Sequence, residues 1–266
     1  MTHALVTLLT LPLLAQPDFS AEKQRVLNEH LAAHVRQWSK PLTNAEVDVY
    51  VRGVGAKLLS DVTDNTVSFT FETIQSDRSE PEGLPGGQIF VPANFILAAR
   101  DESEFAAMLA HTMGHVALGH GRPDMNRGKV ANLASIPLVF LGPLHADTRF
   151  GSVLTPLASF PRVRSMEIEA DRFAVELVSR AGYDPHALGN YLDRTLGTES
   201  RLWPAAERAQ RLSGVERAIQ TTTIQVSAVS GQFARIQRIV RTLVRGRSED
   251  RIPTLRRKEE VQPEQE

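Results

Sequence analysis

The sequence predicts an α+β domain that is mainly helical and carries a small β-sheet. Apolar residues recur at helical spacing through most of the chain, while two neighbouring segments within 66–91 carry strand signals. The order of these signals is helices, a strand pair, then mostly helices. The chain has 266 residues, of which 42% are hydrophobic, so one sizeable core can form. We therefore expect a single domain over 19–245.

The first half of the chain contains two helix signals and two strand signals. A helix is expected over 19–38, and a second should begin at Thr43, where Thr43 and Glu46 can form a capping box. "TVSFTFETI" alternates polar residues with β-branched and aromatic ones, which predicts a half-buried strand over 66–74. "LPGGQIFV" predicts a Gly-Gly turn that leads into a strand over 88–91.

The second half of the chain is predicted to be helical. "DESEFAAMLAHTMGHVALGH" is rich in good helix formers and should form one long helix over about 102–119. "RSMEIEADRFAVELVSRAG" should form another over about 164–181, ended by Gly182. Further helices should start near Pro185 and Pro204. The segment "ARIQRIVRTLVRGR" favours a closing amphipathic helix over one that binds a membrane surface.

Composition excludes several functions. The formal net charge is −1, so the chain lacks the basic excess that nucleic-acid binding requires. The chain has no cysteine, and any metal must therefore be held by His, Asp or Glu.

The two ends of the chain differ from the expected domain. Residues 1–15 include a short apolar run, too short for a membrane span, that is typical of a signal peptide, although only His3 stands where Lys or Arg is expected. This predicts a periplasmic or secreted protein with no transmembrane span. The alternative is an apolar segment that packs on the domain. Residues 246–266 are strongly charged and predict a disordered tail.

Two histidines stand four residues apart in the long predicted helix. At about 100° per residue, His111 and His115 lie about 40° apart and one turn apart, so both rings can reach one metal ion. His120 lies on the other side of the helix and should not join them. Spacing alone leaves open a core helix that merely contains histidines.

A third ligand must come from elsewhere, because tetrahedral zinc in a catalytic site takes three protein ligands and one water. The best candidate is Glu167 in the later helix. Asp171 faces the same way four residues on, and could accept a hydrogen bond from a ligating imidazole. Glu169 points away and should be solvated.

These segments together resemble a known family. "EGLPGGQIFVPANFILAARDESEFAAMLAHTMGHVALGH", followed by "RSMEIEADRFAVELVSRAGYDP", is similar to the gluzincin metallopeptidases that include HtpX, the CAAX prenyl endopeptidases and BepA. The resemblance covers about 45–195 and implies a zincin-like domain whose sheet lies beside the active-site helix. It implies one Zn²⁺ per chain, with the ligands His111, His115 and Glu167 and with Asp171 behind them.

The resemblance also implies a peptide site. The strand after the Gly-Gly turn should lie at the edge of the cleft, where it could pair with an extended peptide or an unfolded protein segment. An envelope protein is a candidate partner. The expected substrate-binding residues are Gly86, Gly87, Gln88, Ile89 and Phe90.

The sequence departs from this family at the residue after the first histidine. A His-Glu-x-x-His protease uses its glutamate to accept a proton from the attacking water, and Thr112 stands there instead. A threonine hydroxyl is a very poor base, so proteolysis should be weak or lost, which predicts a zinc-binding pseudopeptidase. Glu104 lies about 10 Å away along the helix, too far to replace the base.

Other readings of the chain remain open. The protein could be an active metalloendopeptidase with a non-standard base, a peptide-binding chaperone or regulatory module, or a helical domain without a metal. His145, Arg162 and Arg164 are further residues that could enter the site.

Overall fold

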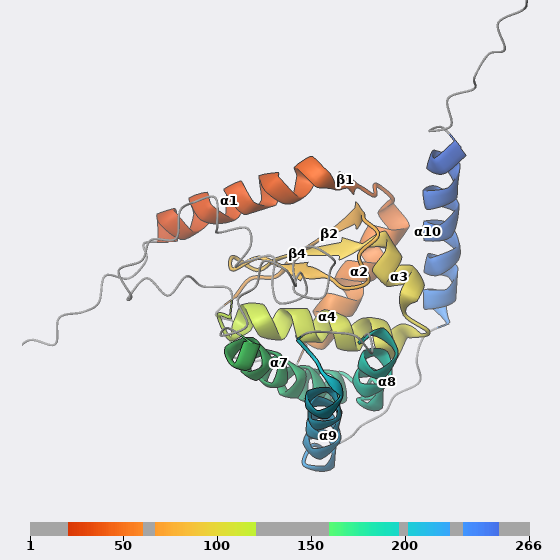
Figure 1. Ribbon diagram of the computed structural model, residues 1–266. Coiled ribbons are helices and arrows are strands. Elements are labelled where there is room, and N and C mark those ends of the chain that lie inside the picture. Colours follow the sequence, from red (N-terminus) through yellow and green to blue (C-terminus); the bar gives the residue numbers. More distant parts are fainter. Residues whose placement is uncertain (1–20, 61–66, 121–159, 197–201, 224–230, 250–266) are drawn as a thin grey trace, which may run out of the picture.

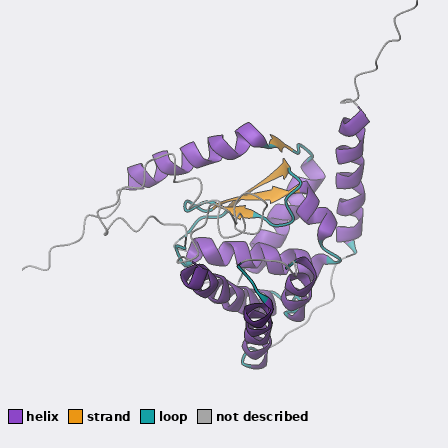
Figure 2. Ribbon diagram, viewed as in Figure 1, coloured by secondary structure: helices purple, strands orange, loops and turns teal. Residues whose placement is uncertain are grey.

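The structure, a computed structural model, describes residues 21–60, 67–120, 160–196, 202–223 and 231–249. Within these ranges helices surround one small sheet, and Figure 2 shows that helix predominates. The elements in chain order are α1 (Ala21–Trp38), β1 (Lys40–Pro41), α2 (Ala45–Leu58), β2 (Thr70–Gln75), β3 (Glu82–Gly83), β4 (Gln88–Pro92), α3 (Ala93–Ala98), α4 (Glu102–Ala117), α7 (Phe160–Arg180), α8 (His186–Thr195), α9 (Ala205–Gln220) and α10 (Gln232–Glu249).

The sheet has four strands in the order β1-β2-β4-β3. β2 and β4 run parallel, with Thr70 opposite Gln88 and Ile74 opposite Pro92. β1 and β3 are antiparallel to their neighbours. The predicted strand pair is thus the centre of the sheet. The sequence analysis missed β1 and β3 because a two-residue strand shows no alternating pattern.

Helices cover both faces of this sheet (Figure 1). One face packs against α1 through a small apolar cluster that consists of Leu31, Ala32, Val35, Ile74, Leu84 and Phe90. On this side Arg36 of α1 also pairs with Glu72 of β2, with its Nε atom 3.1 Å from Oε1. The other face belongs to the main core, to which β4 contributes Ile89 and Val91. Because successive side chains of a strand point to opposite faces, the side chains of β4 are divided between these two cores.

Helix α4 runs through the centre of the main core. Its buried residues extend from Glu102 to Gly114, and α7 lies along it (Figure 1). Gly114 permits this close approach, because a Cβ atom there would lie 3.1 Å from Phe173 Cδ1 and 3.3 Å from Ala170 Cα. The contact sets α4 and α7 close enough for their side chains to meet.

The α+β fold class predicted from the sequence is confirmed. Several boundaries differ. β2 runs from Thr70 to Gln75 and not over 66–74. Asn44, and not Thr43, caps α2, since its Oδ1 accepts from the backbone N–H groups of Glu46 and Val47. α7 begins at Phe160, earlier than expected. α10 continues to Glu249, so 246–249 are helical and do not belong to a tail.

Several predictions fall outside the described residues, namely the signal peptide over 1–15, His145 and the tail over 250–266. Among the helices of the described ranges, none is both long and apolar enough to span a bilayer.

Candidate metal centre

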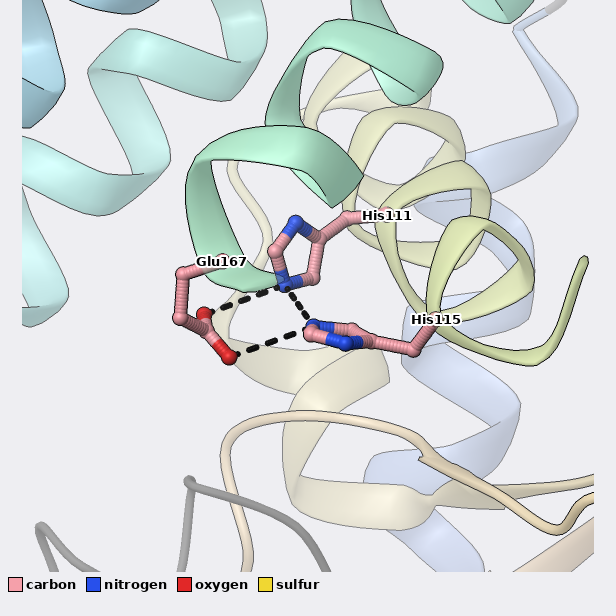
Figure 3. A group of neighbouring side chains, drawn as sticks. All are labelled: His111, His115 and Glu167. Atoms are coloured by element: carbon pink, nitrogen blue, oxygen red, sulfur yellow. Dashed lines mark hydrogen bonds and ion pairs between the residues drawn. The ribbon is translucent and has the colours of Figure 1, made fainter. Parts of the chain in front are cut away.

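Helices α4 and α7 bring two imidazole rings and one carboxylate to the same point (Figure 3). His111 and His115 project from α4, and Glu167 projects toward both from α7. His111 and Glu167 are buried, while the side chain of His115 is 16% exposed. Three side chains from two helices thus meet. Spacing predicted the histidine pair, and the resemblance to the gluzincins implied that Glu167 joins it.

The distances between the three groups suit one tetrahedral ion. The Nε2 atoms of His111 and His115 lie 3.1 Å apart. Glu167 Oε2 lies 3.4 Å from His111 Nε2, and Oε1 lies 3.2 Å from His115 Nε2. A tetrahedron with bonds of about 2.0–2.1 Å has edges of about 3.3 Å. The two ring nitrogens therefore stand close to the separation that such an ion requires, and Glu167 meets the two rings through different oxygens.

The carboxylate of Glu167 is buried where it faces both rings. Its Oε1 atom has His115 Nε2 as a neighbour at 3.2 Å. A buried carboxylate requires positive charge or hydrogen bonds to compensate for its lost hydration. A cation held between the carboxylate and the two rings would supply that charge, so the residues present fit a metal ion.

Asp171 stands behind His111. Its Oδ1 atom lies 2.9 Å from His111 Nδ1. A carboxylate in this place favours the tautomer that carries its proton on Nδ1 and leaves the Nε2 lone pair for a metal. Burial opposes the charged form of this ring, but Asp171 and Glu167 raise the pKa of His111 to about 9. Metal binding at this ring therefore competes with protons.

Arg211 of α9 joins the same cluster, and the sequence analysis missed it. Its Nε and Nη2 atoms lie 2.7 Å and 2.9 Å from the two carboxylate oxygens of Asp171, and Nη2 lies 3.0 Å from Glu167 Oε2. A signal was present in the sequence, because Arg211 precedes the apolar Val215 and Ile219 at intervals of four on one helix face. An arginine on an apolar stripe requires a buried acidic partner.

His120 contacts the other ligand ring. Its Nδ1 atom lies 3.0 Å from His115 Nδ1, and its Nε2 atom lies 3.4 Å from the exposed carboxylate of Glu169. His120 is not one of the three converging groups, as the angle along the helix predicted. It does, however, stand behind His115 much as Asp171 stands behind His111.

Thr112 is buried between α4 and the sheet. Its hydroxyl donates to the backbone carbonyl of Met108 at 3.1 Å. Its methyl group faces β3, since a Cβ atom on Gly83 would lie 3.1 Å from Thr112 Cγ2. The hydroxyl proton is thus already used within the helix.

The other charged candidates have structural partners. Glu104 accepts from the backbone N–H of Arg100 at 2.7 Å and also pairs with Arg194 of α8. Arg164 donates to the carbonyl of Leu202 and to Glu207, and does not reach Asp171. Glu104 therefore packs α4 against α8 and is not available as a base at the metal group.

Residues 86–90, the expected substrate-binding segment, include strand residues that already have partners in the sheet. β4 pairs with β2 on one side and with β3 on the other, where Phe90 opposes Glu82 and Ile89 opposes Gly83. Ile89 and Phe90 are fully buried. Gly87 is also buried, whereas Gly86 and Gln88 line an open cavity of about 460 Å³ against α1. Among the described strands, β3 is the edge strand that contacts α4.

Comparison with known proteins gives the family. Residues 80–244, more than half of the chain, match the model for peptidase family M48. The chain belongs to peptidase family M48. The resemblance to the gluzincin metallopeptidases is thereby confirmed, and the protein is a member of a metalloendopeptidase family.

Curated M48 relatives come from bacteria and from mitochondria. The beta-barrel assembly-enhancing protease of Escherichia coli (strain K12) is 26% identical over 185 residues, which cover 61% of this chain and 36% of that protein. Its counterpart in Yersinia pestis is 23% identical over 198 residues, covering 70% and 40%. A mitochondrial metalloendopeptidase of Saccharomyces cerevisiae is 21% identical over 168 residues, covering 61% and 48%. The chain thus spans less than half the length of these M48 relatives.

Proposed function

We propose that this M48 protein binds one Zn²⁺ through His111, His115 and Glu167, holds extended peptide beside α4, and cleaves it weakly or not at all. The convergence of two ring nitrogens and one carboxylate from two helices carries the proposal. Zinc is favoured over other ions because two imidazoles and one carboxylate form a common ligand set of catalytic zinc sites. When bound, the metal would lower the pKa of an attacking water.

The weak or absent cleavage follows from Thr112. In a His-Glu-x-x-His protease the residue after the first histidine takes the proton of the attacking water. The Thr112 hydroxyl is a poor base, and its own proton is donated to Met108 O. Three carboxylates on α4 and α7 are already engaged, because Glu167 belongs to the metal group, Asp171 is bound by Arg211, and Glu104 pairs with Arg194. General acid–base groups contribute roughly 10²–10⁴-fold, and the loss should be of that size.

The peptide site is proposed at β3 in place of β4. β3 is an edge strand among the described residues, and its Gly83 lies directly against Thr112 and Val116 of α4. A peptide paired to this edge would run beside the metal helix by strand addition. The bacterial relatives are named for enhancing beta-barrel assembly, which supports an unfolded segment of an envelope protein as the occupant. Export through residues 1–15 is part of the same proposal.

Zinc content tests the metal assignment. We expect close to one equivalent of zinc per chain after purification without chelators, because the donors are preformed and two of them are buried. Elemental analysis of the purified protein gives the number directly. Less than about a tenth of an equivalent, with no uptake from added zinc, would contradict the proposal and favour a purely structural helical domain.

A further inference from the structure

The buried guanidinium of Arg211 has a role that the proposed ligand set does not include. We propose that Arg211 is the permanent positive charge that compensates the buried carboxylates of the metal group. It positions Glu167 and Asp171 and balances their charge when the metal is absent. A bound metal ion would supply part of that positive charge itself. This inference rests on the proposed metal site. It adds to that site a positioning residue from a third helix and a coupling between that residue and the metal.

The geometry of Arg211 is that of a clamp. Its side chain is 2% exposed, and one face of its fork binds both oxygens of Asp171 at 2.7 Å and 2.9 Å. The same Nη2 atom reaches Glu167 Oε2 at 3.0 Å. The guanidinium carbon lies 4.6 Å from the ring centroid of Trp203, which restricts the side chain further. Arg211 thus fixes the rotamers of both carboxylates from α9.

The clamp leaves one oxygen of Glu167 available. Oε2 lies 3.0 Å from Arg211 Nη2 and 3.4 Å from His111 Nε2, whereas Oε1 lies 3.2 Å from His115 Nε2. Arg211 and a metal can therefore act on the same carboxylate at the same time, through different atoms. They do not compete for a position, but both supply positive charge to it.

The charges of the cluster determine whether metal binding increases or decreases the contribution of Arg211 to stability. Glu167 and Asp171 are buried within one cluster, and burial alone would raise the pKa of each. Arg211 is the one permanent cation that contacts these two carboxylates among the described residues. The charge of Glu80 also acts on Arg211. Without Arg211, the metal-free cluster would hold two buried carboxylates and no permanent positive charge beside them, which is strongly destabilising. A bound divalent cation would supply the missing charge.

We expect Arg211 to contribute more to the stability of the metal-free protein than to that of the metal-loaded protein. In Arg211→Met the melting temperature should fall by about 10 °C in the presence of a chelator, and by less than half of that in saturating zinc. The zinc-induced rise in melting temperature should therefore be larger in the variant than in the natural protein. A side chain that only packs α9 against α7 would lower both temperatures equally. The measurement is a thermal melt at mildly alkaline pH, where protons compete least with the metal.

Two further variants complete the experiment. Arg208→Met lies on the same helix and removes a pair with Asp193, which is outside the cluster, so its effect should be equal with and without zinc. Arg211→Lys keeps the charge but loses the bidentate fork. Its zinc-induced rise should lie between those of the natural protein and Arg211→Met. If Arg211→Met folds only when zinc is added, the proposal is supported in its strongest form.

The results that would contradict the inference can be distinguished from those that would contradict the proposed function. A zinc-induced rise in Arg211→Met that equals or falls below that of the natural protein would overturn the proposed role of Arg211. If Arg211→Met does not fold in either condition, Arg211→Lys decides by the same comparison. If the natural protein itself shows no zinc-induced rise and no bound zinc, both the proposed function and this inference fail. If the natural protein binds zinc, only the inference is at stake.

Discussion

Thr112→Glu should create strong proteolytic activity if, as proposed, the natural protein has little or none. The variant places a carboxylate on α4 next to His111, on the side that faces β3, where Gly83 has no side chain to exclude it. A carboxylate in this position can accept the proton of the attacking water and later pass it to the leaving amine. Because such groups contribute roughly 10²–10⁴-fold, casein turnover should rise by at least about 100-fold.

Thr112→Gln is the matched control for this experiment. Glutamine has the size and shape of glutamate and can hydrogen-bond water, but it cannot hold the proton. Both variants should contain the same amount of zinc as the natural protein, and only Thr112→Glu should digest casein rapidly. Equal rates for the two would show that the missing base is not the limiting defect. Natural protein that retains casein without cutting it would favour the peptide-binding alternative, whereas rapid cutting would indicate a non-standard base.

Glu167→Gln should weaken zinc binding by at least about 100-fold. Loss of a residue that only hydrogen-bonds to a metal ligand already costs roughly 10–100-fold in affinity, and Glu167 is a proposed ligand itself. The substitution keeps the shape of the side chain and removes the one anionic donor of the group. Burial raises the pKa of Glu167, but His115, Arg211 and His111 together hold it well below its usual value. The natural side chain is therefore ionised at neutral pH and ready to bind a cation.

Competition with a chromophoric chelator measures the affinity of Glu167→Gln for zinc. Glu176→Gln is the control, because Glu176 lies on the same helix α7 but is exposed and pairs with Arg180, outside the metal group. Its affinity should equal that of the natural protein. Zinc binding that survives unchanged in Glu167→Gln would remove Glu167 from the ligand set and leave the two histidines without their proposed third partner.

The parts of the centre that lie within one helix were predictable from the sequence. The 3.6-residue repeat alone places His111 beside His115 and Glu167 beside Asp171. That α4 and α7 lie side by side was not derivable from spacing, and came from the likeness to the gluzincins. The structure shows the local cause, which is the close approach at Gly114. The helical α+β class was also predictable from local patterns, because the helices are long periodic segments.

The parts that were missed depend on contacts between distant segments. Arg211 lies forty residues beyond Asp171, and α9 carries further arginines from which pattern alone did not separate it. The interior position of β4 depends on β3, whose two residues form no recognisable pattern. The contact of His120 was missed for a local reason. Its Nδ1 atom lies 3.0 Å from His115 Nδ1 because the turn after α4 departs from the ideal helical angle. Local periodicity predicts elements, whereas partners across elements require the packed fold.

Anomalous diffraction at the zinc edge, from crystals of the zinc-loaded protein, tests the central claim most directly. The account predicts one strong peak that lies about 2.0–2.2 Å from the Nε2 atoms of His111 and His115 and from a carboxylate oxygen of Glu167. A peak beyond bonding reach of Glu167, or no peak between the two rings, would contradict it.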